Sequence, residues 1–420
     1  MSNKYKYASI NETPIYEDVI DGKGKKKINS ILLGTYVKIV EQSGDWYKVN
    51  TAGPDGWIHK NHLSDKMGLK VFYLDVAQGD GILIEIGEYK ILIDAGPNDC
   101  LYNYLTKWQY KYLLKGQKKV HIDYLIISHF DTDHFKGFIK ILQDKGFEFG
   151  TICHPGILKY SSRNNNHNTG LGNTFAQSGM TYLDQIFDDL LTIDEPDNFN
   201  QNIANFLRAL KKAKTDNRLG EVKRYSAGQM VIKKTIEDND FKMEVLAPFT
   251  EKIDGKDAYI YWKDESKTIN GHSLVIKVTF GFCTFLFGGD LNSDSENYLM
   301  NKYGNNNPFE TDITKSCHHG SSDFTTAFME KMKPYATIIS SGDNEQYSHP
   351  RADAIGCAGK YSKGKKPLVF STELARSVNM KNNKIIYGMI NARCDGEKIY
   401  ISQMKEVKKN NDIWDSYQAK

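Results

Sequence analysis

The sequence predicts an α+β protein built in two parts, a small strand-rich unit followed by a larger unit of alternating strands and helices. In residues 1–65, short apolar or alternating runs are separated by turn signals such as 43–45 and 54–56. From Val71 onward, apolar runs of strand length alternate with segments of helical spacing, among them 103–114 and 135–145. The length of 420 residues exceeds one small core and favours two or three domains.

The strand-rich unit has two tryptophans at the start of predicted strands. Trp46-Tyr47-Lys48-Val49 follows one turn, and Trp57-Ile58-His59 follows the other. This pattern resembles bacterial SH3-like domains, which implies a small β-barrel over 1–66. Such barrels bind peptides or cell-wall segments through exposed aromatic residues, and here docking of an internal protein partner is favoured. Equally, Trp46 and Trp57 can fill the barrel core, and both interpretations stay open.

Composition sets the expected class of protein and its compartment. Lys+Arg 55 against Asp+Glu 52 gives a formal net charge of +3, which argues against binding of polyanions over the whole surface. The six cysteines lie far apart, without a C-x-x-C pair, so a reducing compartment is expected. No apolar stretch is long enough for a signal peptide or a membrane span. We therefore expect a cytoplasmic protein with no membrane partner.

The segment from Ser128 to His134 holds the densest group of potential metal ligands. It follows the apolar run 124–127, which is typical of a buried strand, so its two histidines and two aspartates lie on the loop at the strand end. Imidazoles and carboxylates converging in this way bind divalent cations. A plain helix start, with Ser128 as its cap, is the alternative interpretation. It leaves both histidines unexplained, so a metal site is favoured.

This segment also carries a family resemblance. His129-x-Asp131-x-Asp133-His134 resembles the HxHxDH signature of the metallo-β-lactamase superfamily, with Asp131 in place of the second histidine, as in the branch of the ComEC competence proteins. Further segments match that branch in order, namely 71–80, 91–96, 287–290, 316–321 and 347–350. The resemblance implies an αββα sandwich over 67–404, with an insertion at about 155–225 and a polar, frayed tail at 405–420.

The insertion contains a polar, turn-rich stretch at 161–175, followed by helical spacing at 181–191 and 203–214. A lid over the site and a passive surface excursion are both compatible with this pattern.

The resemblance implies a site for two divalent metal ions, zinc or, given the oxygen-rich ligands, manganese. It assigns His129 and Asp131 to the first metal, Asp133 and His134 to the second, Asp290 as the bridge between them, and His349 as the last ligand. Asp94, at the end of the strand 91–93, is expected to hold the metal loop by hydrogen bonds. His272 in Gly271-His272-Ser273 is a further candidate ligand, but an alignment on Ser273 makes His272 a variable position. The role of His272 is therefore left open.

The adjacent histidines His318 and His319 complete the predicted site. They follow the predicted strand 313–317, where neighbouring side chains point to opposite sides, so at most one should face the metals. The resemblance gives this segment a role as metal ligand or as the acid that protonates the leaving group. We favour His319 as the acid. The candidate catalytic residues are thus Asp133, His319 and His318.

Together these features predict a metal-dependent hydrolase. Two metal ions suit attack at phosphorus, and the ComEC-like branch implies phosphodiesters, DNA in particular, so a phosphodiesterase or nuclease is favoured. Basic residues within 107–119 and 211–218 would suit a phosphate backbone, although such runs on helices are more often solvated faces. An ester or lactone hydrolase using the same metals, and a catalytically silent binding protein, are the alternatives.

Overall fold

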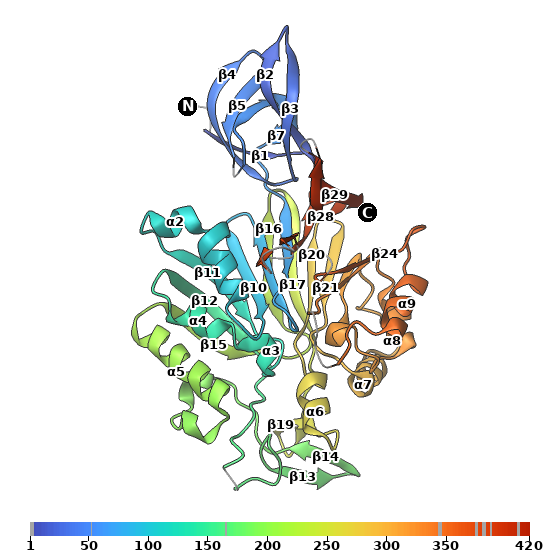
Figure 1. Ribbon diagram of the computed structural model, residues 1–420. Helices are drawn as coiled ribbons and strands as arrows, with labels where there is room; N and C mark the ends of the chain where they lie inside the picture. The colour runs from blue at the N-terminus through green and yellow to red at the C-terminus, as the bar shows by residue number, and fades with distance from the viewer. Residues whose placement is uncertain are drawn as a thin grey trace.

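The computed structural model describes residues 4–51, 53–163, 166–342, 347–373, 377–379, 384–386, 389–409 and 412–420. The chain begins with a curled antiparallel sheet that stands at one end of a larger layered body (Figure 1). Its strand order is β3-β2-β6-β5-β4-β1-β7. The strands are β1 (Tyr5–Ala8), β2 (Thr13–Ile20), β3 (Lys23–Ile31), β4 (Tyr36–Ser43), β5 (Trp46–Asn50), β6 (Gly56–His59) and β7 (Leu63–Ser64), with a 3-10 turn at Lys60–His62.

The two tryptophans of this barrel differ in their surroundings. Trp46 is buried, and its indole Nε1 donates a hydrogen bond to the Gly22 carbonyl at 3.1 Å. Trp57 is half-buried, with the Lys48 ammonium 5.8 Å from its ring centroid. Trp46 therefore contributes to the structure of the barrel and is not an exposed aromatic for a partner.

The larger body contains two sheets packed face to face (Figure 1). The nine-stranded sheet has the order β15-β12-β11-β10-β9-β8-β27-β28-β29. Its strands are β8 (Leu69–Leu74), β9 (Gly81–Ile86), β10 (Tyr89–Ala95), β11 (Val120–Ile126), β12 (Phe147–His154), β15 (Leu219–Arg224), β27 (Met389–Cys394), β28 (Ile399–Lys409) and β29 (Asp412–Gln418). Strands β10, β11, β12 and β15 run parallel, so their carboxyl ends share one edge.

The opposing seven-stranded sheet has the order β16-β17-β20-β21-β22-β23-β24. Its strands are β16 (Met230–Ile236), β17 (Asn239–Ala247), β20 (Val275–Phe280), β21 (Cys283–Phe287), β22 (Ile313–Lys315), β23 (Ala336–Ile339) and β24 (Leu368–Ser371). Strands β21 to β24 are parallel. The inner faces of the two sheets meet in one apolar core that includes Val71, Ile84, Ile276 and Phe285.

Helices cover the outer face of each sheet, which makes the body an αββα sandwich (Figure 1). The helical segments over the nine-stranded sheet are α1 (Cys100–Tyr104), a π-helical turn (Leu105–Gln109), α2 (Lys111–Lys115), α3 (Thr132–Phe135), α4 (Phe138–Gln143) and α5 (Gln201–Thr215). Over the other sheet lie α7 (Ser293–Tyr303), α8 (Thr326–Met332) and α9 (Ala352–Lys360). This arrangement confirms the predicted fold class.

Two strands of the insertion after β12 join two later strands in a small separate sheet with the order β13-β14-β19-β18. Its strands are β13 (Thr174–Gln177), β14 (Met180–Leu183), β18 (Glu251–Ile253) and β19 (Lys256–Ile260), and nearby lie 3-10 turns at Leu190–Thr192 and Pro196–Asn198 and helix α6 (Glu265–Gly271). The helix predicted at 181–191 is therefore wrong, because backbone pairing of β14 with β13 and β19 overrides the local apolar spacing. The helix predicted at 203–214 is present as α5.

The C-terminal residues also differ from the prediction of a frayed tail at 405–420. They complete β28 and form β29, which pairs antiparallel with β28 at the sheet edge. Backbone hydrogen bonds form an edge strand without the continuous apolar pattern that sequence reading relies on. Trp414 adds a tertiary anchor, since its Nε1 donates to the Ser30 carbonyl of the barrel at 3.0 Å. Strand β25 (Ser377–Asn379) pairs antiparallel with β26 (Lys384–Ile386).

The inter-sheet core yields a stability prediction. Phe285 on β21 is 0% exposed between the sheets, whereas Phe282, three residues earlier, is 76% exposed. Because Phe285→Ala leaves a cavity in the core, it should lower the free energy of unfolding by about 3–5 kcal/mol. The matched control Phe282→Ala should change it by less than about 0.5 kcal/mol. Urea unfolding followed by circular dichroism would measure both, and similar unfolding midpoints for the two variants would contradict the packing described here.

Candidate metal centre

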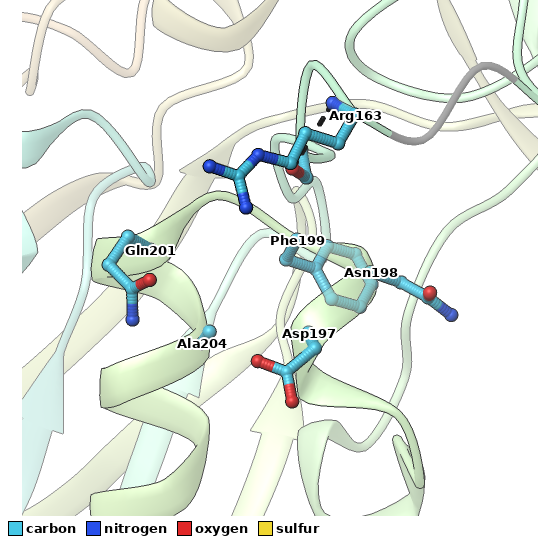
Figure 2. A pocket seen from close by; sticks show the side chains of 7 residues that line it. Arg163, Asp197, Asn198, Phe199, Gln201 and Ala204 are labelled. Carbon is cyan, nitrogen blue, oxygen red and sulfur yellow. Dashed lines mark hydrogen bonds between the residues drawn. The ribbon is translucent and has the colours of Figure 1, made fainter.

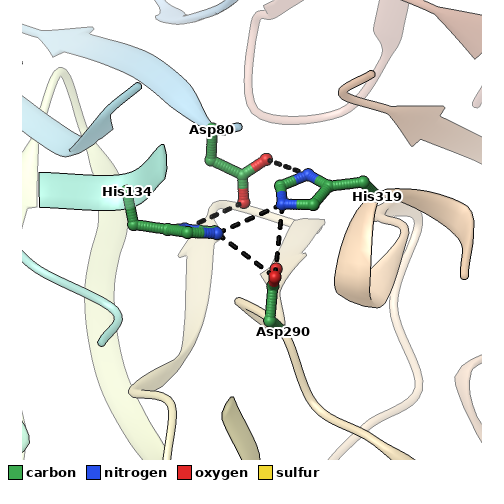
Figure 3. A group of neighbouring side chains, drawn as sticks. All are labelled: Asp80, His134, Asp290 and His319. Carbon is green, nitrogen blue, oxygen red and sulfur yellow. Dashed lines mark hydrogen bonds and ion pairs between the residues drawn. The ribbon is translucent and has the colours of Figure 1, made fainter. Parts of the chain in front are cut away.

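A group of four buried acidic and imidazole side chains gathers where strands of both sheets end (Figure 3). Asp80 directly precedes β9, and His134 lies in α3 behind the loop that follows β11. Asp290 follows β21, and His319 lies in a 3-10 turn (Cys317–Gly320) after β22. Their potential ligand atoms all lie within 4.8 Å of one another. Two sheets thus contribute to one cluster.

The centre of this cluster is a triangle of lone-pair atoms. His134 Nε2 lies 3.2 Å from Asp290 Oδ2 and 3.2 Å from His319 Nε2, and His319 Nε2 lies 3.2 Å from Asp290 Oδ2. Asp133 Oδ2 is 3.4 Å from His319 Nε2 and 4.0 Å from His134 Nε2. Ligand atoms bound about 2.0–2.1 Å from one tetrahedral zinc ion lie about 3.3 Å apart, so these spacings match the edges of a coordination shell.

Two glycines allow the chain segments to approach this closely. Gly79, before Asp80, has φ +134°, and a Cβ there would lie 2.2 Å from the carbonyl oxygen of Asp133. Gly289, before Asp290, has φ +55°, and its Cβ would lie 2.7 Å from the Cβ of Ser273. Any larger residue would push Asp80 or Asp290 away from the histidines.

Asp94 anchors the metal loop from behind. Its Oδ1 accepts a hydrogen bond from the Ser128 amide at 2.8 Å, and its Oδ2 accepts one from the Ser128 hydroxyl at 2.6 Å. Asp94 Oδ2 also lies 2.8 Å from His134 Nδ1. The carboxylate therefore fixes the tautomer of His134, leaving Nε2 free to bind a metal in the cluster.

The other residues of the HxDxDH segment flank this cluster. His129 is fully buried, its ring 4.1 Å from that of His134, and its Nε2 has no hydrogen-bond partner among the described residues. Asp131 caps α3 and lies 3.6 Å from the Lys159 ammonium. Burial of Asp131 raises the pKa of its carboxyl although Lys159 opposes the shift. Asp131 is thus turned toward the insertion.

The histidine pair does not follow the geometry predicted from a strand. Strand β22 ends at Lys315, and both His318 and His319 have left-handed backbones, with φ of 47° and 53°. Strand alternation therefore does not apply, and both imidazoles approach the same carboxylate. His318 Nε2 is 3.9 Å from Asp290 Oδ2, against 3.2 Å for His319. His319 is 1% exposed inside the cluster, whereas the His318 side chain is 27% exposed.

His349 lies at the edge of the site. Its ring centroid is 5.8 Å from that of His318, and its Nδ1 is 3.3 Å from Gln78 Nε2. The structure brings His349 beside His318, and it lies outside the four-residue cluster.

His272 is not at the metal centre, which corrects its candidacy as a ligand. Its Nε2 lies 2.8 Å from the Ile260 carbonyl oxygen, and its ring stacks between Tyr259 and Trp262, with centroids 4.4 Å away in each case. Burial lowers the pKa of His272 to about 4, so the imidazole is a neutral hydrogen-bond donor. Ser273 contacts the centre instead: its hydroxyl lies 3.3 Å from His129 Nδ1 and accepts from the Asp290 amide at 3.1 Å.

Sequence reasoning missed two residues of the centre, Asp80 and Lys315. The Lys315 ammonium is fully buried, 2.6 Å from Asp80 Oδ2 and 3.4 Å from Asp290 Oδ1, and it donates to the Gly289 carbonyl at 2.9 Å. Asp80 lay within the motif 71–80 but was assigned to a turn. The only pattern in the sequence that could point to Lys315 is its position in a short predicted strand, because a lysine buried there needs an acidic partner.

The charges at the centre favour a bound cation. Burial opposes ionisation of Asp290, but His134, His319 and Lys315 outweigh it and hold the pKa of this carboxyl well below its usual range. Burial likewise opposes protonation of His319, yet Asp290 and Asp133 raise the pKa of its imidazole to about 9. Asp80 Oδ1 is buried without a hydrogen-bond partner among the described residues. Asp80 and Asp290 contact the Lys315 ammonium, and Asp133 adds a third carboxylate beside His319, so a divalent cation fits both the donor set and the spacing.

A hollow in the insertion lies beside the metal loop. Asn202, at the start of α5, donates to the Thr132 hydroxyl at 3.4 Å, which joins the insertion to the loop. The cavity has a volume of about 600 Å³. Figure 2 shows the Arg163 guanidinium extending across it toward Gln201. The lining residues are Ser161, Arg163, Asp197, Asn198, Phe199, Gln201 and Ala204.

Comparisons with known proteins agree with this fold. Residues 74–161 match the metallo-beta-lactamase superfamily, and residues 22–64 match the bacterial SH3 domain. The chain thus contains a segment that matches the metallo-beta-lactamase superfamily, and a segment that matches the bacterial SH3 domain precedes it.

Two curated relatives are similar to a short part of this chain. The chain is 32% identical over 94 residues to ComE operon protein 3 of Bacillus subtilis (strain 168), covering 22% of this chain and 12% of that protein. It is 34% identical over 100 residues to competence protein ComA of Neisseria gonorrhoeae, covering 23% and 14%. The chain thus spans only a small part of these relatives. Among solved structures, the metallo-beta-lactamase fold protein YhfI from Bacillus subtilis aligns with a TM-score of 0.38 and 12% identity, covering 76% of this chain and 99% of that chain.

The position of each histidine leads to a prediction about metal content. His134→Gln should lose bound zinc or manganese, because it removes a nitrogen from the central triangle. The matched variant His272→Gln should keep it, since a glutamine amide can still donate toward the Ile260 carbonyl. Elemental analysis of the purified proteins would measure the difference. Equal loss of metal in both variants would return His272 to the ligand set.

Proposed function

We propose that this protein is a metal-dependent phosphodiesterase, with DNA as the favoured substrate. The observation that carries the proposal is the single buried carboxylate of Asp290, which His134, His319 and Lys315 all contact. A carboxylate in this position suits a bridge between two cations, and paired cations suit hydrolysis of phosphodiesters. The regional similarity to two competence proteins supports the choice of DNA.

The residues suggest how two cations would be held. The triangle of His134, His319 and Asp290, with Asp133 beside it, would hold one ion. The second would lie on the side of His129 and Asp131, where the unpartnered His129 Nε2 supplies a nitrogen. With mixed nitrogen and oxygen donors, zinc and manganese are both suitable. When bound, the ions would supply an activated water and would stabilise charge on the phosphate oxygens.

Lys315 supports this arrangement as a positioning residue. Its ammonium bridges Asp80 and Asp290 from beneath the cluster and contacts both carboxylates. It therefore keeps two acidic groups at a fixed separation before any metal binds, and it offsets part of their mutual repulsion. The site is in this way prepared to bind cations.

The insertion offers contacts for the remainder of a nucleic acid. Lys159 lies 3.6 Å from Asp131 at the border of the site, and Arg163 extends over the neighbouring cavity (Figure 2). Both basic side chains suit the phosphates that flank a scissile bond.

The barrel is proposed to dock a protein partner through its exposed Tyr5 and Tyr36, whose ring centroids lie 5.2 Å apart in a stacked arrangement.

The experiment for this proposal compares substrates. Protein reconstituted with manganese or zinc should hydrolyse bis(p-nitrophenyl) phosphate and single-stranded or double-stranded DNA. Cyclic nucleotides and lactones should be poorer substrates by kcat/KM. Preference for lactones would favour the ester hydrolase, and inactivity toward all substrates with both metals bound would favour a binding protein.

Loss of the bridging carboxylate gives a sharp test. Asp290→Ala should reduce turnover to the limit of detection, because it removes the oxygen shared by both proposed cations. Its far-ultraviolet circular dichroism should match that of the wild type, since Asp290 follows β21 and is not part of it. Asp294→Ala, on the exposed side of α7, is the matched control and should retain full activity. Wild-type activity in Asp290→Ala would remove Asp290 from the centre.

The two adjacent histidines should differ in their effects. His319 reaches the ligand triangle, so we propose it as a metal ligand, and the more exposed His318 as the donor of a proton to the leaving group. His318→Ala should therefore keep its metal and lose about two to four orders of magnitude in turnover of DNA, while sparing nitrophenyl esters, whose leaving groups need no proton. His319→Ala should lose metal. The reverse pattern would assign the acid to His319, as the sequence suggested.

A further inference from the structure

A second cavity, separate from the metal centre, lies between the barrel and the nine-stranded sheet. Its volume is about 510 Å³. Strand β3 of the barrel forms one wall, and β27, β8 and β29 form others. In Figure 1, β28 and β29 rise from the body beside the base of the barrel. This size falls within the range of small-molecule sites.

The register of β27 explains which side chains face this cavity. Asn391 and Arg393 lie two residues apart and so share one face of β27, where they pair with Phe72 and Lys70 of β8. Phe72 belongs to the core beneath the helices, which identifies this as the outer face of the sheet. Elsewhere on that face helices cover apolar residues, whereas here the barrel covers polar ones.

The charges on this face do not cancel. Lys70 and Glu85 form a buried ion pair with a 2.6 Å Nζ–Oε2 distance. Arg393 is 6% exposed, and its Nη2 donates a hydrogen bond to Asn391 Oδ1 at 2.8 Å, but the described part of the chain places no carboxylate within ion-pair distance of it. Burial lowers the pKa of its guanidinium to about 10. A buried cation without a carboxylate partner is costly, and an anionic group on the ligand would neutralise it.

Three hydrogen-bond donors on the cavity wall also lack partners in the described chain. They are Arg393 Nε, Asn391 Nδ2 and the Ser30 hydroxyl. Asn391 and Ser30 are each 1% exposed. Buried donors are almost always paired in folded proteins, so three together on one cavity indicate an acceptor that completes them.

The remaining walls are aromatic. Phe72 lies beneath the Arg393 guanidinium, with the Cζ atom 4.7 Å from the ring centroid. Trp414 is held in place by its hydrogen bond to the Ser30 carbonyl, and Tyr104 lies across the cavity. Flat aromatic walls around a cationic donor set suit a planar ring that carries one anionic group.

We propose that this cavity binds a small aromatic anion, a planar ring bearing a phosphate or a carboxylate. The anionic group would accept from Arg393, Asn391 and Ser30, and the ring would pack against Phe72 and Trp414. Because the ligand would contact both β3 of the barrel and β27 of the sandwich, its binding would hold these two parts together. The site is independent of the metal centre and of the function proposed for it.

The test uses full-length protein labelled with 5-fluorotryptophan and carrying Asp290→Ala, so that the metal centre does not process the probes. The fluorine resonance of Trp414 is assigned with Trp414→Phe. Phenyl phosphate and benzoate should each shift this resonance saturably, and the tighter of the two identifies the preferred anion. Benzyl alcohol, which has the ring without charge, and inorganic phosphate, which has charge without the ring, should bind at least about tenfold more weakly.

Variants of the donors complete the test. Arg393→Gln should weaken binding of the better probe by about tenfold or more, as expected for loss of a charged hydrogen-bond donor. Ser30→Ala, a smaller change that preserves the fold, should weaken it severalfold. The matched control Arg208→Gln, on the exposed face of α5, should bind like the parent protein. Absence of a Trp414 shift with both probes, or equal affinity in Ser30→Ala and its parent, would overturn the proposal.

Discussion

The burial of the Asp290 carboxylate constrains the whole active end of this molecule. It lies where strands of both sheets end, and an isolated buried carboxylate there would be protonated or expelled, so positive and hydrogen-bonding groups must meet it. Lys315 comes from the neighbouring strand of the same sheet, and His134 lies in α3, which follows β11 of the opposing sheet. Because these partners follow strands of both layers, the site depends on the packing of the two sheets against each other.

The supporting contacts around Asp290 show how the sandwich keeps the site in shape. Asp94 holds both Ser128 and His134, and Ser273 contacts both His129 and the Asp290 backbone. Asp94 and Ser273 are both buried, and each connects a different segment of the sandwich to the metal loop. The loop is therefore fixed before a cation binds, which limits the loss of conformational freedom on binding.

The barrel and the C-terminal strands are connected to the sandwich at a distance from the metal centre. Strand β29 closes the edge of the nine-stranded sheet and at the same time contacts the barrel through Trp414. Glu237, in the turn between β16 and β17, accepts hydrogen bonds from the amides of Met67 and Gly68 in the linker at 2.7 Å each. The barrel is thus attached to both sheets.

The described helices include none long and apolar enough to cross a bilayer.

The sequence by itself determined the fold class and the loop that carries the candidate ligands, because these depend on local patterns: apolar runs of strand length, turn residues, and four potential ligands, two histidines and two aspartates, within His129–His134. It could not determine which distant residues meet that loop. Packing of segments that are far apart in the chain places Asp80 and Lys315 at the centre and His272 away from it. The edge strand β29 was equally invisible, since backbone pairing needs a partner strand and not an apolar pattern. Only the tertiary structure decides such cases, because the electrostatic partner of a buried group is set by where the strands end in space.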